Sequence, residues 1–112
     1  MAIECVNTLE IRLSEAVEST FEETARSCLQ TLQLSAGCLE YTLTQSTREV
    51  GLWWLTGYWE SEDRMNRSFK SDPMLQLLNS LVEAGAQLHF WRFVPEPAAA
   101  QDDSVNRAAF DL

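Results

Sequence analysis

Few side chains in this 112-residue chain have the chemistry of a catalytic group. The single histidine, His89, has no partner close to it in the sequence, so we interpret it first as a structural histidine and second as a general base. About half of the 17 acidic residues fall on predicted helix surfaces, which is typical of solvated faces rather than of a paired-carboxylate mechanism. The sequence has no glycine-rich phosphate loop, zinc motif or nucleophile elbow.

Asn7 is the other polar side chain in an unexpected place. From Ile3 to Leu13 the odd positions are otherwise apolar and the even positions mostly polar, which predicts a strand with one buried face. A buried amide must find hydrogen-bond partners. Asn7 is therefore either a structural amide bonded to neighbouring backbone or a polar group that points into a pocket.

A stretch near the middle of the chain predicts a strand that is apolar on both faces. Strand side chains alternate between faces, so one face carries Leu52, Trp54, Thr56 and Tyr58, and the other Trp53, Leu55, Gly57 and Trp59. Such a strand needs cover on both sides. The chain has only enough helix for one side, so we expect a second copy to cover the other in a homodimer.

The remaining elements complete a βαββαβ order. Ser14 is placed to cap a helix that runs to about Leu34, and Cys38 to Gln45 forms a half-polar edge strand paired with the aromatic one. Two helical segments then begin at Ser61 and at Asp72-Pro73, and a last strand runs from Ala86 to Val94. This order predicts a ferredoxin-like α+β sandwich, with an antiparallel sheet that carries its helices on one face.

Composition limits the possible partners and compartments. We expect one domain over residues 1–94 and a tail over residues 95–112 that is disordered or forms a short docking helix. The net charge of −9 disfavours nucleic acid and anionic membranes. No apolar run reaches the roughly 18 residues of a membrane span. The cysteines Cys5, Cys28 and Cys38 lack CxxC spacing, and we interpret them as buried residues of a cytoplasmic protein without a metal site.

Three short motifs carry a resemblance to a known family. They are Gly37-Cys38-Leu39-x-Tyr41, the strand end Tyr58-Trp59-Glu60-Ser61, and Phe69-Lys70-Ser71-Asp72-Pro73. In spacing and order over residues 1–94 the chain resembles the antibiotic biosynthesis monooxygenase domain family, which forms dimeric ferredoxin-like α+β barrels.

The resemblance implies a cofactor-independent monooxygenase. In such enzymes an electron-rich aromatic substrate, deprotonated in an apolar pocket between the sheet and its helices, reduces O₂ itself, while hydrogen-bond donors stabilise the anion. It implies a catalytic role for Trp59, and we add Asn7 and His89 as catalytic candidates from the residue patterns described above. The side chains expected to contact the substrate are Trp54, Tyr58, Met65 and Phe69.

The match is partial, and two alternatives stay open. The asparagine and tyrosine of the quinone-forming members are Leu55 and Met65 here. Haem-degrading relatives use an asparagine that Asn7 matches, but their tryptophan and haem-ligating histidine are Ser68 and Leu78. The second alternative is a dimeric module that binds a small molecule, or acts in stress, without turnover.

Overall fold

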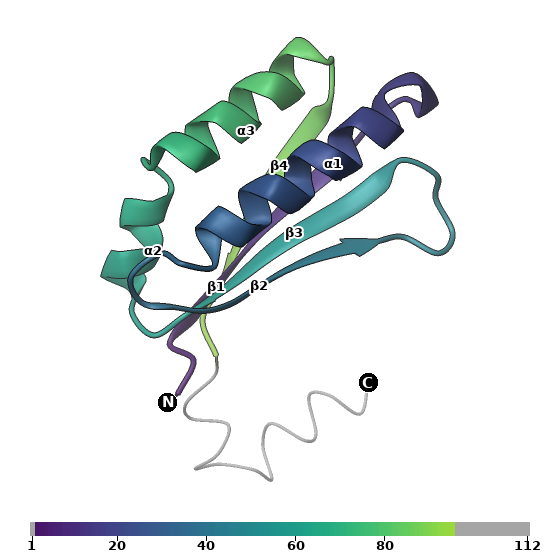
Figure 1. Cartoon of the computed structure of the whole chain (residues 1–112). Helices are drawn as coiled ribbons and strands as arrows, with labels where there is room; N and C mark the ends of the chain where they lie inside the picture. The colour runs from purple at the N-terminus through teal and green to yellow at the C-terminus, as the bar shows by residue number, and fades with distance from the viewer. Residues whose placement is uncertain (1, 96–112) are drawn as a thin grey trace, which may run out of the picture.

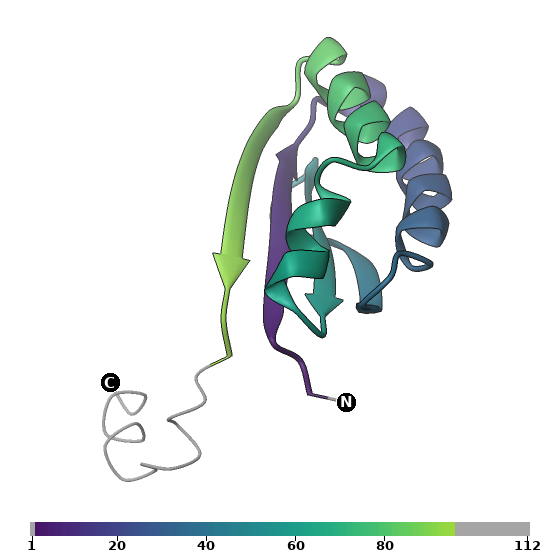
Figure 2. The ribbon, with the colours of Figure 1, turned by 90° about the vertical axis from the view of Figure 1, so that its left-hand side faces the viewer.

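The computed structural model describes residues 2–95, apart from the side chains of residues 15–19. Its elements, in chain order, are β1 (Cys5–Arg12), α1 (Glu15–Leu32), β2 (Cys38–Gln45), β3 (Leu52–Trp59), α2 (Glu62–Ser68), α3 (Asp72–Glu83) and β4 (Gln87–Phe93) (Figure 1). Neighbouring strands are antiparallel and lie in the order β2-β3-β1-β4. All the helices cover one face of this sheet (Figure 2). The predicted ferredoxin-like α+β fold is therefore confirmed, while the predicted tail lies outside the described residues from residue 96 onward.

Helix ends follow local chemistry. The Ser61 hydroxyl accepts a hydrogen bond of 3.1 Å from the Arg64 backbone N–H and so caps α2. Gly37 and Gly85 have φ of +82° and +78°, the left-handed conformation in which the chain turns back toward the sheet after α1 and α3. Ser14 does not cap α1 with its side chain, contrary to our expectation. The N-cap residue of α3 is Ser71, and Asp72, where we expected the helix to begin, is already in its first turn.

The core lies between the sheet and the helices. Alternate residues of β1 and β3 point into it, and the helices contribute apolar side chains from their inner faces. Phe21 of α1, for example, meets Trp53 of β3 edge to face, with ring centroids 5.4 Å apart. In the described part of the chain, no helix combines the length and apolar character needed to cross a membrane.

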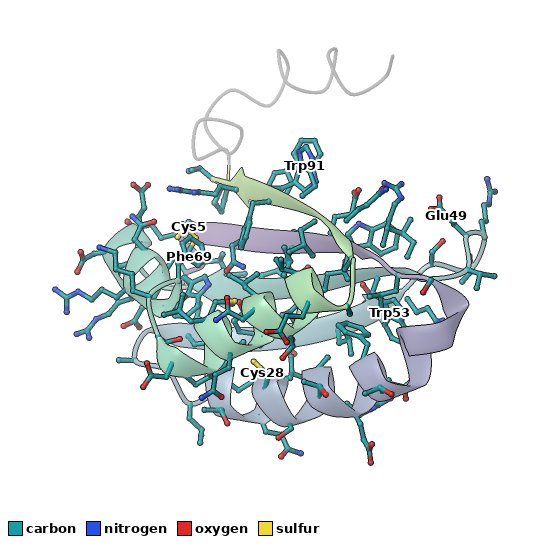
Figure 3. The ribbon with its side chains drawn as sticks, turned by 90° about the horizontal axis from the view of Figure 1, so that it is seen from above. Cys5, Cys28, Glu49, Trp53, Phe69 and Trp91 are labelled. Carbon is teal, nitrogen blue, oxygen red and sulfur yellow. The ribbon has the colours of Figure 1, made fainter. Side chains whose placement is uncertain are left out.

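Among residues 2–95, no helix covers the opposite face of the sheet (Figure 2), and this face is largely aromatic. Figure 3 shows Trp91 projecting from β4 on the side away from α1 and α3. Trp91 and Phe93 are 43% and 49% exposed, and the Thr8 and Thr56 hydroxyls of the central strands lie 3.2 Å apart. A hollow of about 480 Å³ lies among Thr8, Thr44, Trp54, Thr56, Trp91 and Phe93. We call this surface the open face.

Candidate functional site

Three polar side chains from three strands meet in the apolar core. The Trp59 indole N–H donates a 2.7 Å hydrogen bond to Asn7 Oδ1, and Asn7 Nδ2 donates a 3.2 Å hydrogen bond to the Tyr41 hydroxyl. The rings of Tyr41 and Trp59 meet edge to face at 6.1 Å. All three side chains are 0–1% exposed, so the Asn7–Trp59–Tyr41 cluster is closed to solvent in this conformation. Asn7 is thus bonded to two aromatic side chains rather than to neighbouring backbone.

Gly57 makes room for this cluster. It pairs with Asn7 on one side and with Tyr41 on the other, and it lies two residues before Trp59 on the same face of β3. A Cβ at this position would lie 2.7 Å from Asn7 Oδ1 and 2.8 Å from Trp59 Nε1. Its φ is not in the positive range, so the backbone conformation does not itself demand glycine. Glycine fits at position 57 because the atoms of the Trp59–Asn7 hydrogen bond occupy the space that a Cβ would need.

The Tyr41 hydroxyl is held in its neutral form. Burial raises its pKa from 10.0 to about 12, while the hydrogen bond from Asn7 acts in the opposite direction. The nearby thiols of Cys38 and Cys28 raise this pKa slightly further. At neutral pH Tyr41 is therefore a hydrogen-bond donor and acceptor, not a base.

This pKa predicts a loss of stability in alkali. A phenol whose pKa is higher in the folded state stabilises the protein fully below the unfolded-state pKa, and this contribution is lost as pH rises through the folded-state pKa. Between about pH 10 and 12 the free energy of unfolding should fall by up to about 3 kcal/mol more in the wild type than in Tyr41→Phe. Urea unfolding across this range measures the difference. Parallel curves for the two proteins would contradict the buried-phenol assignment.

The residues singled out from the sequence fall on two sides of the sheet. Trp59 and Asn7 lie together on the helix side, where Met65 of α2 is 1% exposed in the same core. Phe69 follows α2, with its ring 5.8 Å from that of Phe90 and the Arg92 guanidinium 5.7 Å above it.

The other three candidates lie on the open face, which Trp54, Tyr58 and His89 share. His89 stacks on Trp91 with ring centroids 4.2 Å apart. The sheet therefore separates this group from Asn7 and Trp59, so one pocket cannot use both groups. Tyr41 was not among the predicted site residues. Its place on the apolar side of β2 was visible in the sequence, but its pairing with Asn7 was not.

Residues 5–79 match the family model described as antibiotic biosynthesis monooxygenase. The chain belongs to this family. The match spans β1 to the middle of α3 and so includes all three members of the Asn7–Trp59–Tyr41 cluster. A search of curated proteins found no match.

Solved structures with the same fold include other members of the antibiotic biosynthesis monooxygenase group. A candidate monooxygenase of this kind from Deinococcus radiodurans has a TM-score of 0.78 at 15% identity, covering 84% of this chain and 94% of that one. SnoaB, a cofactor-independent oxygenase from Streptomyces nogalater, has a TM-score of 0.73 at 14% identity, covering 85% and 95%. A conserved protein from Methanosarcina mazei has a TM-score of 0.75 at 12% identity, covering 84% and 95%. At these identities the likeness shows a shared fold.

The described residues do not fit a haem on the helix side of the sheet. The positions that would hold a tryptophan and a ligating histidine are Ser68, whose hydroxyl donates a 2.7 Å hydrogen bond to the Met65 carbonyl, and the partly buried Leu78. The chain's one histidine, His89, lies on the open face. Haem degradation at Asn7 therefore lacks the ligating histidine that those relatives use.

Proposed function

We propose that this protein is a monooxygenase that oxidises a small, electron-rich aromatic with O₂, without a metal or an organic cofactor. For an anthrone-like substrate the overall change is R₂CH₂ + O₂ → R₂C=O + H₂O. One oxygen atom enters the substrate and the other leaves as water. All the electrons come from the substrate, so no external reductant is required. Family membership supports this class of reaction.

The observation that carries the proposal is the hydrogen-bonded cluster in the core. Its Trp59 N–H is already bound to Asn7, so the indole orients the amide rather than meeting the substrate directly. Two donors remain: the second N–H of Asn7, and the hydroxyl proton of Tyr41, which has no acceptor among residues 2–95. Donors fixed in an apolar core stabilise an anion far better than donors in water. A phenolate or enolate oxygen beside Asn7 and Tyr41 would receive both.

Trp59→Phe tests this proposal, because it removes the N–H that holds Asn7 and keeps an aromatic ring. Oxygen uptake by metal-free protein is measured against hydroquinones, anthrones and catechols, with product identification and a boiled-protein control. We expect uptake above autoxidation for the wild type and a loss of about tenfold or more in the variant. Unchanged uptake in folded Trp59→Phe would contradict the catalytic role of the cluster.

The assembly we propose is a homodimer in which two open faces pack together. Trp54, Tyr58, Trp91 and Phe93 form an aromatic surface on the sheet face that α1, α2 and α3 leave uncovered (Figure 2). Exposed apolar areas of this kind are typical of interaction sites. Two identical faces related by a twofold axis cover each other.

The second candidate function is a small-molecule-binding module without turnover. The closed packing of Asn7, Trp59 and Tyr41 favours it, since a cluster satisfied within the core can serve structure alone. A ligand that raises the melting temperature without oxygen uptake or product would identify this class.

A further inference from the structure

We propose that the groove between α1 and α3 binds a small uncharged aromatic molecule, with its apolar part inserted toward the sheet and its polar group at the rim. None of the described residues that line the groove belongs to the Asn7–Trp59–Tyr41 cluster, so the groove is a second binding surface, separate from the place proposed for the reacting oxygen. Its test measures binding alone, so the two proposals can fail separately.

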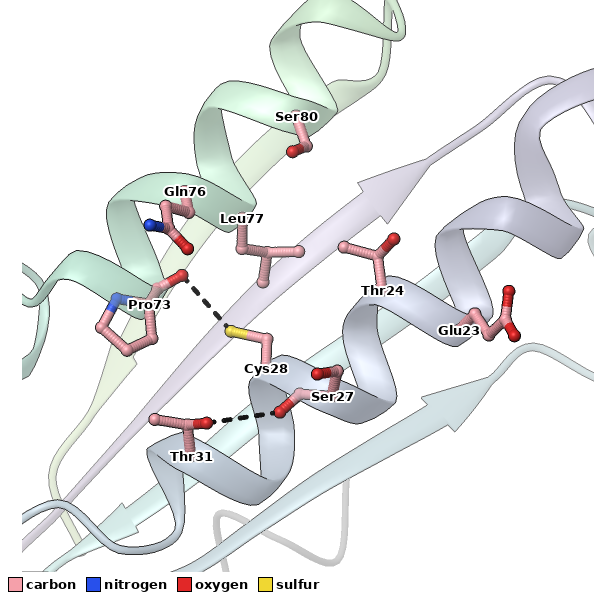
Figure 4. A pocket seen from close by; sticks show the side chains of 9 residues that line it. All are labelled: Glu23, Thr24, Ser27, Cys28, Thr31, Pro73, Gln76, Leu77 and Ser80. Atoms are coloured by element: carbon pink, nitrogen blue, oxygen red, sulfur yellow. Dashed lines mark hydrogen bonds between the residues drawn. The ribbon is translucent and has the colours of Figure 1, made fainter.

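The groove has the dimensions of a ligand site. It is an open groove of about 490 Å³ between the two helices, and this volume is within the range of about 300–1,000 Å³ that is usual for small-molecule pockets. Figure 4 shows its lining side chains, from Glu23 to Thr31 on α1 and from Pro73 to Ser80 on α3. The side chains of Thr24, Ser27 and Ser80 are short, which keeps the space between the helices open.

An apolar hollow adjoins the groove and determines which end of a ligand would point toward the core. This hollow of about 150 Å³ shares Thr24, Leu77 and Ser80 with the groove. Its other walls include Phe21 and Leu81, which are buried in the core between helices and sheet. A planar apolar group placed in this hollow would be transferred from water into contact with aromatic and aliphatic side chains, which is favourable.

The rim of the groove carries polar side chains that can hydrogen-bond to a ligand. The Thr31 hydroxyl donates to the Ser27 carbonyl and the Cys28 thiol donates to the Pro73 carbonyl, as the dashed lines of Figure 4 show. No such bond to another described residue is made by the hydroxyls of Thr24, Ser27 and Ser80 or by the Gln76 amide. These groups are therefore hydrated when the groove is empty. A ligand hydroxyl or carbonyl can replace that water.

Charge then selects the ligand class. Among the described lining residues, Glu23 is the one carboxylate and none is a lysine or arginine, and the chain carries a net charge of −9. A carboxylate, sulfonate or phosphate would be repelled and would find no cation to pair with. A neutral phenol meets neither obstacle.

Matched naphthalenes test the proposal by NMR titration of the ¹⁵N-labelled full chain. We expect 1-naphthol to shift amide signals of α1 and α3 and to bind about tenfold more tightly than 1-naphthoate at pH 7. Thr24→Phe and Ser80→Phe fill the groove from opposite helices and should each weaken naphthol binding about tenfold or more. Gln30 is exposed on α1 and does not line the groove, so the control variant Gln30→Phe should bind 1-naphthol like the wild type.

Each result of the titration either supports or overturns the proposed groove site. Shifts on the helices, charge discrimination and loss in both groove variants support the site, whether or not oxygen uptake occurs. The inference is overturned if naphthol does not saturate, if naphthoate binds equally well, if the shifts fall on the open face, or if neither groove variant weakens binding. Circular dichroism confirms folding of each variant, and Thr24 and Ser80 are both exposed, so their replacement leaves the core intact.

Discussion

Gly57→Ala is expected to lower the free energy of unfolding by about 3 kcal/mol, a large effect for one added methyl group. The new Cβ would lie within 2.8 Å of atoms of Asn7, Trp59 and Tyr41. Contacts this short force a shift in β1, β2 or β3, and a shift of Asn7 or Trp59 disturbs the buried hydrogen bond between them. Chemical denaturation measures the loss, and near-ultraviolet circular dichroism reports whether Trp59 keeps its environment.

Gly85→Ala is the matched control for this substitution. Gly85 has φ of +78° and no atom within 4 Å of an added Cβ, so alanine there meets backbone strain without crowding. We expect a loss of about 1 kcal/mol, the ordinary penalty for a left-handed alanine. If Gly57→Ala costs no more than Gly85→Ala, the space above Gly57 is not what fixes the cluster.

Thr56→Asp is expected to convert a dimer into monomers. Thr56 lies on β3, one of the two inner strands, at the centre of the open face. Two unpaired carboxylates buried across a twofold interface should raise the dimer dissociation constant on the order of a thousandfold or more. Light scattering at micromolar concentration should give twice the 12.7 kDa chain mass for the wild type and the single mass for the variant.

Gln30→Asp controls for the added negative charge, since it introduces the same charge on the exposed helix layer. This variant should remain dimeric. A wild type that is monomeric at micromolar concentration would remove the dimer proposal, and so would a Thr56→Asp protein that stays dimeric while folded.

The fold could be predicted from the sequence because each element carries a strong local pattern. β2 and β3 were predicted with the bounds that the structure gives, since Gly37 and Gly51 delimit two short runs of strand-forming residues. Helix ends were less accurate. Ser14 and Asp72 satisfy the composition rules for caps, but cap geometry depends on where the neighbouring chain lies.

The site was predictable only in part, because its bonds join residues that are distant in sequence. Asn7 was recognisable as an exception on an apolar strand face, and Trp59 through the family resemblance. Their bond spans 52 positions, and the bond from Asn7 to Tyr41 spans 34. Periodicity assigns a residue to a face but not to a partner across strands. For the same reason His89 was grouped with Trp59, since its face relative to β3 depends on the register between strands. Trp54 was grouped with Trp59 although the alternation along β3 already places the two on opposite faces.

The strand order also determines when the sheet can be completed during synthesis. β1 lies inside the sheet, and its outer neighbour β4 is the last of the described strands to be made, with Val6 opposite Phe93, 87 positions later (93 − 6). The β2–β3 hairpin can form from adjacent residues, whereas β1 keeps one unpaired edge until nearly the whole domain has left the ribosome. A nascent chain is therefore most exposed to strand-mediated aggregation just before β4 emerges.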